Sequence, residues 1–405
     1  MQTRLPKSFL DTPNGKMADS ILRSCVHCGF CTATCPTYQL TGDELDSPRG
    51  RIYLIKQMLE DQPVSSHTQI HLDRCLTCRS CETTCPSGVE YGKLIDLGRE
   101  WAEKKVSRPK TERSKRWLLR KILPYPKRYA WLIAVARFIR PVMPAKMKQT
   151  IPPRPSEGVI PRDSHARKML MLSTCAQSVL QPNIDAAMQR VLGCFDIELA
   201  HAPASGCCGA IDQHLSAPDS ARKQMQRNID SWWPLLQNEF EYIVINASGC
   251  GSHVKEYGHY FKDDVVYREK AAFISTKAKD LSEIISTLPL EKINKTTGTP
   301  RIAFHSPCTL QHGLRITNLI EPLLSELGYN LMPVKDSHLC CGSAGTYSIL
   351  QPDFSGQLLK NKIQCLNEHK PSIIATANIG CLLHMQSQSS VPVKHWIELL
   401  DDLID

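Results

Sequence analysis

The sequence predicts an α+β protein of several domains, with an α-helical ferredoxin domain followed by two repeated α/β lobes. Two nearly identical cysteine runs, with helical patterns between and after them, predict the first domain. Strands that alternate with helices in the second half, together with a cysteine spacing that occurs twice, predict the two lobes. We expect four segments, with these boundaries: 1–107, 108–166, 167–290 and 300–405.

The two cysteine runs begin at Cys25 and Cys75, and both read C-x2-C-x2-C-x3-C-P. Ferredoxin-type domains use this run to bind [4Fe–4S] clusters, and the fourth cysteine of each run ligates the other cluster. We therefore expect Cys25, Cys28, Cys31 and Cys85 to bind one cluster, and Cys75, Cys78, Cys81 and Cys35 to bind the second. Zinc is the alternative, but it is commonly bound by two separated cysteine pairs. Because two such clusters would lie close together, we expect this chain to transfer single electrons.

Helical spacing of apolar residues follows each run, over 51–60 and 93–105. These faces are predicted to pack around the clusters. Two arginines, Arg49 and Arg51, and two acids, Asp43 and Glu44, follow the first run. The arginines are interpreted either as charges that tune a cluster potential or as solvated residues of a loop and a helix start.

The segment 108–148 is strongly basic, with thirteen Lys or Arg residues against one acid, Glu112. Its cations alternate with aromatic residues, and no apolar run approaches the ~20 residues that cross a bilayer. We expect this segment to lie on an anionic membrane surface. A docking surface for an acidic partner subunit and a solvated helix are the alternatives, and nucleic acid is not an expected partner. A Pro-rich linker is predicted at 151–161.

The repeated half contains four cysteines per lobe, at matched positions. A strand leads into the first cysteine, a Cys-Cys-Gly triplet follows 32 residues later, and a second strand ends in Gly-Cys-x-x-His. Parallel strands place such residues together at the carboxyl edge of a sheet. The cysteines are interpreted as ligands of a further cluster, as redox thiols, or as small buried apolar residues. They are Cys175, Cys207, Cys208 and Cys250 in the first lobe, and Cys308, Cys340, Cys341 and Cys381 in the second, with His253 and His384 nearby.

The sequence lacks a dinucleotide-binding G-x-G-x-x-G motif after a strand, and it lacks a P-loop. A chain with iron–sulfur ligands but no hydride acceptor is expected to receive electrons from a flavin on another subunit. The first residues have no apolar signal-peptide region, which together with the many cysteines predicts a cytoplasmic location.

The twin cluster runs, the twin Cys-Cys-Gly motifs and the segments 47–55, 247–251, 337–346 and 395–398 together resemble the glycolate oxidase iron–sulfur subunit over nearly the whole chain. The resemblance implies an FAD-containing partner subunit that oxidises glycolate to glyoxylate, and a second FAD-binding-type subunit. It implies that electrons leave towards the respiratory chain or quinone pool, at the cytoplasmic face of the inner membrane, where the complex is peripheral.

The resemblance also implies that this chain alone oxidises no substrate and that the eight cysteines of the two runs bind its clusters. More distant relatives, the heterodisulfide reductases, end each lobe in Cys-x-x-Cys, whereas this chain has His253 and His384 at those positions. Two other functions stay open from the sequence. One is the same role in a lactate or glycerol-3-phosphate dehydrogenase, and the other is a non-catalytic iron–sulfur redox sensor.

Overall fold

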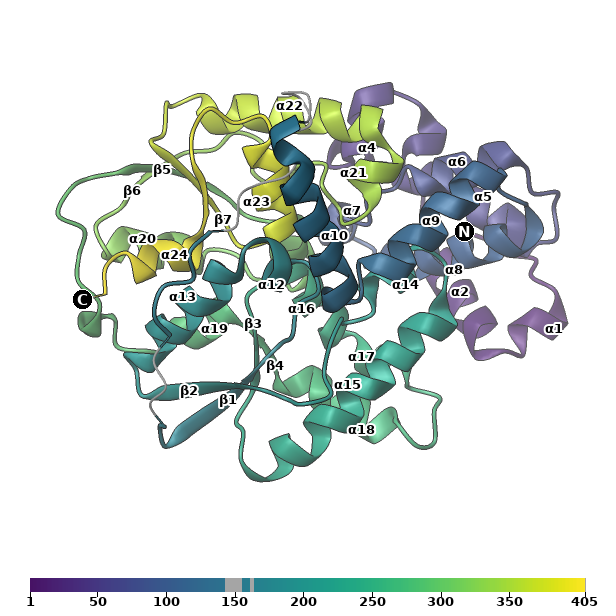
Figure 1. The fold of residues 1–405 in the computed structure, drawn as a ribbon. Coiled ribbons are helices and arrows are strands. Elements are labelled where there is room, and N and C mark those ends of the chain that lie inside the picture. The colour runs from purple at the N-terminus through teal and green to yellow at the C-terminus, as the bar shows by residue number, and fades with distance from the viewer. Residues whose placement is uncertain (143–154, 161–163, 405) are drawn as a thin grey trace.

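The structure is a computed structural model that describes residues 1–142, 155–160 and 164–404. Residues 151–154 and 161 of the predicted linker, and the end of the basic segment at 143–148, lie outside the described residues. Figure 1 shows the N-terminal helices on one side of the molecule, and two α/β lobes beside them. The predicted fold class, a helical ferredoxin domain followed by two α/β lobes with parallel sheets, is confirmed.

The first domain is built from short helices connected by the two cysteine loops. Its elements are α1 (Lys7–Leu10), α2 (Pro13–Ser24), α3 (Phe30–Ala33), α4 (Pro36–Thr41), η1 (Glu44–Asp46), α5 (Pro48–Leu59), α6 (Ser66–Asp73), α7 (Ser80–Thr84) and α8 (Tyr91–Lys105). Helix α5 starts with Ser47 as N-cap and Pro48 as first residue, a combination that favours helix initiation. The predicted apolar faces of α5 and α8 are buried against each other.

A close approach of these two helices depends on Gly98 in α8. A Cβ atom at this position would lie 2.6 Å from a side-chain carbon of Ile55. The small residue lets the helices meet directly behind the cysteine loops, and so positions both loops on one rigid support.

The basic segment forms α9 (Lys110–Ile122), α10 (Pro126–Ile139) and η2 (Arg140–Val142), separated near Pro124 and Pro126 as predicted. Several of its cations pair with acids of the chain. Arg108 and Arg116 both pair with Asp73, and Arg120 pairs with Asp212 of the first lobe. These arginines therefore attach the segment to the rest of the protein.

The first lobe has a four-stranded parallel sheet with the strand order β2-β1-β3-β4. Its strands are β1 (Arg167–Met171), β2 (Ile197–His201), β3 (Ile243–Ile245) and β4 (Ala278–Asp280). Its helices are α12 (Gln177–Leu180), α13 (Pro182–Gly193), α14 (Ala210–His214), α15 (Pro218–Asn238), α16 (Ser248–Lys255), α17 (Tyr257–Tyr260), α18 (Arg268–Lys277) and α19 (Leu281–Ile285), with η3 (Leu290–Lys292) after them.

The second lobe repeats this topology with the order β6-β5-β7-β8. Its strands are β5 (Arg301–His305), β6 (Asn330–Met332), β7 (Ile373–Thr376) and β8 (Val393–His395). Its helical elements are η4 (Thr309–Gly313), α20 (Ile320–Glu326), α21 (Tyr347–Leu350), α22 (Pro352–Asn367), α23 (Ile379–Gln386) and α24 (Trp396–Asp401).

The two lobes share one hydrophobic core. Buried residues of the first sheet and of α13 belong to the same cluster as those of the second sheet and α24. Polar contacts cross the same boundary, since Arg190 pairs with Asp401 and the Nε2 of His395 donates to the carbonyl of Asn246 over 2.9 Å. The repeat therefore forms one packed unit with two carboxyl sheet edges.

Candidate metal centres

The two cysteine loops have the same backbone conformation at matched positions. His27 and Gly29 in the first loop, and Thr77 and Arg79 in the second, all have positive φ between 54° and 88°. Three of these four are not glycine, and this conformation is uncommon for non-glycine residues. The repeated turns curve each loop so that its first three cysteines surround a common space.

The first pocket is lined by Cys25, Cys28, Cys31 and Cys85, and the space between its lining residues, with the part open to solvent included, is about 420 Å³. Three of these cysteines come from the first run and the fourth from the second. Cys28 is exposed, and the neighbouring side chains of Val26 and Phe30 are 66% and 62% exposed. The first pocket thus opens to the surface beside apolar side chains.

The second pocket is lined by Cys35, Cys75, Cys78 and Cys81, and the corresponding space is about 300 Å³. Here the exchanged cysteine comes from the first run. Cys81 also lines the first pocket, as do Pro48 and Tyr91, so the two pockets are adjacent. The structure therefore brings together the same two groups of four cysteines that the sequence assigns to two clusters.

The chemistry and spacing of these donors fit iron–sulfur clusters. All eighteen cysteines lie in the described part of the chain, and each is a free thiol. Two sulfurs bound to one zinc ion lie at most about 4.6 Å apart, twice the Zn–S distance. Among the described residues, no three sulfurs of these two pockets lie within 4.8 Å of one another. This wider spacing suits a cube with several irons better than a single ion.

Burial raises the pKa of two thiols in each pocket and so favours their protonated forms while no metal is bound. It raises the pKa of Cys25, and it raises the pKa of Cys31 to about 11. Binding of iron requires thiolates, so metal uptake must release these protons. Cluster binding by the two pockets is therefore coupled to pH.

Arg51 places a buried positive charge beside the second pocket. Its side chain is 1% exposed, its guanidinium donates to Thr37 and to the carbonyl of His71, and it also contacts the sulfur of Cys35 at 4.0 Å. Of the two sequence interpretations, this position fits a charge that tunes a cluster. Tyr91 donates to Cys75 from the other side of the pocket over 3.6 Å.

Arg49 lies closer to solvent than Arg51 and lines the first pocket, where it pairs with Glu44. The Arg49 hydrogen bond holds the pKa of Glu44 below its usual range. Asp43 caps η1 by accepting from the backbone of Leu45. Asp43 thus has a local structural role.

The four cysteines of each lobe form a row. We name Cys175, Cys207, Cys208 and Cys250 the first thiol row, and Cys308, Cys340, Cys341 and Cys381 the second thiol row. In each row the first cysteine interacts with the second, the second with the third, and the third with the fourth, so that neighbouring thiols affect one another's pKa. The Cys308–Cys340 sulfur distance is 3.7 Å. The rows lie at the carboxyl ends of β1 and β3 and of β5 and β7, as predicted.

The glycine of each Cys-Cys-Gly triplet is required by the backbone. Gly209 has a φ of 99° and Gly342 a φ of 90°. A Cβ on Gly342 would also lie 2.8 Å from the carbonyl oxygen of Ser355. Only glycine combines this conformation with this close approach, so the triplet is needed to turn both cysteines into the row.

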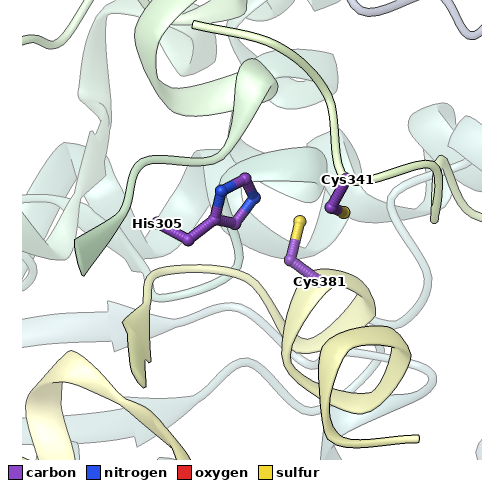
Figure 2. A group of neighbouring side chains, drawn as sticks. All are labelled: His305, Cys341 and Cys381. Carbon is purple, nitrogen blue, oxygen red and sulfur yellow. The ribbon is translucent and has the colours of Figure 1, made fainter. Parts of the chain in front are cut away.

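The two rows differ in their nearest imidazole. In the second lobe a nitrogen of His305 and the sulfurs of Cys341 and Cys381 lie within 4.8 Å of one another, and Figure 2 shows the ring facing the two thiols. His305 is 1% exposed, and both ring nitrogens lack a hydrogen-bond partner. Burial lowers the pKa of His305 well below its usual range, so the ring is neutral.

The sequence interpretation did not single out His305. It emphasised His253 and His384, and among the described residues the structure places neither in a group of ligand atoms that lie within 4.8 Å of one another, although the Nε2 of His253 lies beside Gly209. His384 contacts the hydroxyl of Ser355, while His253 lies among Tyr257, Tyr260 and His214. Burial lowers the pKa of His253 to about 3. An alignment of the two repeats could have drawn attention to His305. His305 lies three positions before Cys308, whereas the matched position before Cys175 is the apolar Leu172.

The second thiol row lies against the second pocket. Leu76, Cys308, Cys340 and Tyr347 form one buried cluster, and Cys78 packs against it. The Tyr347 hydroxyl donates to the carbonyl of Arg74 at 3.0 Å. The first thiol row has a different neighbour, since Cys175 is close enough to Tyr129 of α10 to affect the pKa of that phenol, which burial raises. The second lobe is therefore the one that adjoins a cluster pocket.

One further group of potential ligands has a structural explanation. Asp43, Asp46 and His71 lie close together, but the carboxylate of Asp46 already pairs with Arg51 and Arg74 and contacts His71. These ion pairs satisfy the buried carboxylate.

Helix α10 has an exposed apolar stripe. Trp131, Val135, Phe138 and, beyond its end, Val142 follow one another at helical spacing, with Phe138 and Val142 85% and 86% exposed. No helix in the described ranges is long and apolar enough to cross a membrane.

Comparisons with known proteins agree with this arrangement. The family model "4Fe-4S dicluster domain" matches residues 21–89, and the family model "Cysteine-rich domain" matches residues 169–255 and 302–386. The "Glycolate oxidase iron-sulfur subunit" of Escherichia coli (strain K12) is 49% identical over 407 residues, which cover 100% of both chains.

More distant relatives cover less of the chain. The "Probable glycolate oxidase iron-sulfur subunit" of Bacillus subtilis (strain 168) is 27% identical over 401 residues, covering 92% of this chain and 90% of the relative. "Lactate utilization protein A" of Bacillus licheniformis is 26% identical over 241 residues, covering 58% of this chain and 99% of the relative.

Proposed function

The chain belongs to the family of glycolate oxidase iron–sulfur subunits, which gives it a role in iron–sulfur electron transfer, and we propose that it serves a complex that oxidises glycolate. In this proposal an FAD-containing partner subunit oxidises glycolate to glyoxylate, and a second FAD-binding-type subunit completes the complex. The observation that carries the proposal is the full-length relationship at 49% identity, together with two adjacent four-cysteine pockets.

The ligand sets follow the two pockets. Cys25, Cys28, Cys31 and Cys85 would hold one [4Fe–4S] cluster, and Cys35, Cys75, Cys78 and Cys81 the other. When bound, the clusters supply one-electron transfer. The exchange of the fourth cysteine ties both loops to both sites, and Cys81, which lines both pockets, places the sites next to each other.

The surroundings of the two pockets suggest the direction in which electrons pass through the ferredoxin domain. The first pocket opens to the surface beside the exposed Val26 and Phe30, so we place the docking surface for the flavin subunit there. The cysteines of the second pocket are more buried than those of the first, and Cys78 and Cys308 place this pocket next to the second thiol row. Electrons would therefore enter at the exposed side of the ferredoxin domain and leave from its buried side.

The two thiol rows are candidate ligands of additional iron or redox-active thiols. Four thiols that interact in series, in two copies, exceed what a small buried apolar residue requires. An iron content above eight per chain would support the ligand role, whereas loss of activity in Cys208→Ala with eight irons retained would support the thiol role.

We further propose that the complex is peripheral to the cytoplasmic face of the inner membrane and delivers electrons towards the quinone pool. The support comes from α10, whose exposed apolar stripe lies next to exposed cations such as Lys127. Such a helix can lie in the interface of an anionic bilayer. Part of the basic charge is neutralised by ion pairs within the chain, because Arg108, Arg116 and Arg120 have acidic partners.

A reconstitution experiment tests whether the flavin subunit oxidises glycolate while this chain only transfers the electrons. The purified chain with intact clusters is mixed with glycolate and a dye acceptor, alone and with the separately purified flavin subunits. We expect dye reduction by the flavin subunits and transfer to a quinone acceptor only when this chain is added. Glycolate oxidation by this chain alone would contradict the proposal, and lactate or glycerol-3-phosphate in place of glycolate provides the substrate control.

A further inference from the structure

We propose that Glu256 of the first lobe is a positioning residue for the proposed electron transfer. It holds the guanidinium of Arg79 at the second pocket, so that the first lobe helps to set the reduction potential of the cluster bound there. The inference rests on the proposed function, in which this pocket holds a [4Fe–4S] cluster. Arg79 lines the second pocket, whereas Glu256 does not. Glu256 therefore acts on the cluster through Arg79.

Arg79 occupies a backbone position that favours glycine. It follows Cys78 in the second cysteine run and has a φ of 60°, and the matched residue of the first run is Gly29, with a φ of 88°. A residue with a Cβ atom rarely adopts this conformation, and it persists where the surrounding structure holds it there. The side chain of Arg79 must therefore make contacts that offset the unfavourable backbone.

Those contacts come from the first lobe. Both terminal nitrogens of Arg79 donate to the carboxylate of Glu256, and the Nη2–Oε2 distance is 2.7 Å. The two side chains are 13% and 21% exposed, so solvent screens the pair only in part. Two hydrogen bonds to one carboxylate also fix the orientation of the guanidinium. Burial alone would lower the pKa of Arg79, but the hydrogen bond and charge of Glu256 outweigh it and raise this pKa, so the guanidinium stays positive.

The elements on both sides of the ion pair hold it in place. Gly92, near the start of α8, leaves room for the arginine, since a Cβ atom there would lie 2.8 Å from the Nε of Arg79. Glu256 connects α16 to α17, and its carbonyl accepts from the backbone of His259 and Tyr260. The carboxylate is thus presented from a fixed backbone. Helix α16 also carries the last cysteine of the first thiol row, so one helix joins that row to the second pocket.

The second lobe contacts the same cysteine loop through neutral groups. The hydroxyl of Thr83 and the Nδ1 of His312 are hydrogen-bonded at 2.8 Å, and the Tyr347 hydroxyl donates to the carbonyl of Arg74 at 3.0 Å. Burial lowers the pKa of His312, so this ring is neutral. At these contacts the first lobe contributes a charge and the second lobe does not.

The charges predict opposite effects of two substitutions. Arg79→Gly removes a positive charge and should lower the potential, because the reduced cluster is the more negative form. Glu256→Gln removes the counter-charge and should raise the potential, since Glu82 and Asp96 of the ferredoxin domain still attract Arg79. The first variant gives the second loop the residue that the first loop already has. The second variant keeps the shape of the side chain.

The test is a redox titration of the anaerobically purified full chain with its clusters in place, followed by electron paramagnetic resonance. Cys35→Ser, which should lose the second cluster, assigns its signal. At a fixed potential, the ratio of reduced to oxidised second cluster should fall about tenfold in Arg79→Gly, which is about 59 mV for one electron. In Glu256→Gln the ratio should rise about threefold, because this charge lies farther from the pocket. The double variant should lie between the two.

Asp401→Asn is the matched control. It removes the bidentate ion pair between Arg190 and Asp401, which is similarly exposed but joins the two lobes, and neither residue lines a cluster pocket. The second cluster of this variant should keep the wild-type potential. Iron and acid-labile sulfide contents equal to those of the wild type verify that each variant retains both clusters, and Glu256→Gln decides the case if Arg79→Gly loses iron.

An unchanged potential in Glu256→Gln would overturn the inference. So would a shift in the same direction as in Arg79→Gly, because that result would indicate a general loosening of the junction and not an effect of charge. Either result, with both cluster signals present in the wild type, leaves the proposed function intact. Absence of the second cluster signal from the wild type would overturn the proposed ligand set together with this inference.

Discussion

At the scale of single residues, Arg51 has the clearest influence on the proposed electron transfer. Its buried guanidinium lies beside Cys35, and it is held in place by Thr37 and the carbonyl of His71. Burial alone would lower the pKa of Arg51, but the nearby Tyr91, Cys75, Cys35 and Asp46 outweigh this effect and raise it, so the side chain stays positive. A fixed positive charge favours the reduced, more negative form of a neighbouring cluster.

We therefore predict that Arg51→Gln lowers the reduction potential of the cluster in the second pocket. A loss of about 1.4 kcal/mol of electrostatic stabilisation corresponds to a shift of about 60 mV for one electron. The measurement is a redox titration followed by electron paramagnetic resonance. Arg51→Lys keeps the charge and should retain most of the potential. Arg49→Gln, at the first pocket, should leave the second potential unchanged.

The exchanged cysteines give the second prediction at this scale. Cys35→Ser should damage the cluster formed with Cys75, Cys78 and Cys81, although Cys35 belongs to the first run. Cys85→Ser should damage the other cluster. Paramagnetic resonance of the reduced variants distinguishes the two signals. If Cys35→Ser instead lost the cluster bound by Cys25, Cys28 and Cys31, and kept the second cluster, the fourth cysteines would not be exchanged between the two runs.

At the scale of elements, β8 and α24 connect the two lobes through His395. Its Nε2 donates to the carbonyl of Asn246, and its Nδ1 accepts from the backbone of Ile397 at the start of α24. These two contacts require the neutral ring with its proton on Nε2. Burial lowers the pKa of His395 to about 4, well under its value of about 6.5 in an unfolded chain.

This difference predicts a pH dependence of stability. Between pH 6.5 and 4 the unfolded state binds a proton that the folded state does not, so stability is fully present above about pH 6.5 and falls as the pH decreases. From pH 7.5 to 5.5 this residue should cost about 1 kcal/mol. Denaturant unfolding of the wild type and His395→Gln checks this, since Gln keeps the donor but does not titrate. An equal pH dependence in both would contradict the assignment to His395.

Helix α10 carries the prediction on membrane binding. Its exposed stripe should insert into the interface of anionic vesicles, and Trp131→Gln with Phe138→Gln should weaken binding at least tenfold, because each large apolar side chain contributes about 1.5–3 kcal/mol when buried. Sedimentation with vesicles of increasing anionic lipid content measures the effect. Tyr129→Phe, on the side facing Cys175, is the control.

Salt adds a second test of the same element. Exposed charges are screened within ~10 Å at 0.1 M salt, so high salt should release part of the bound protein. Binding that is unaffected by both the double substitution and salt would mean that α10 is not the membrane contact and would favour docking on an acidic partner subunit.

The elements also show which features a single sequence can predict. The cysteine runs were predictable because iron ligands must follow one another at fixed spacing in one loop. The strands at Met169 and Ile302 were predictable from short apolar runs before a cysteine. His305 was not, because its approach to Cys381 depends on the parallel register of β5 with β7, in which His305 lies opposite Thr376. The burial of Arg51 likewise depends on how α5, α6 and η1 pack.

At the scale of the whole molecule, the chain combines two cluster pockets with a double α/β unit whose two lobes share a hydrophobic core. The sequence repeat predicted two lobes but not the shared core between α13 and α24, which arises from contacts between residues about 200 positions apart. The ferredoxin domain contacts both lobes, through Arg79 and Glu256 in the first and Thr83 and His312 in the second. The second pocket is thereby enclosed between the ferredoxin domain and the second lobe.

The central claim is that electrons from glycolate reach this chain through a flavin partner and occupy its two clusters. The direct measurement is rapid freezing of the reconstituted complex after mixing with glycolate, followed by paramagnetic resonance. The account predicts that both cluster signals appear within a turnover when the flavin subunits are present, and that neither appears when this chain is mixed with glycolate alone. Full turnover to the quinone acceptor while both clusters stay oxidised, or their reduction without the flavin subunits, would contradict it.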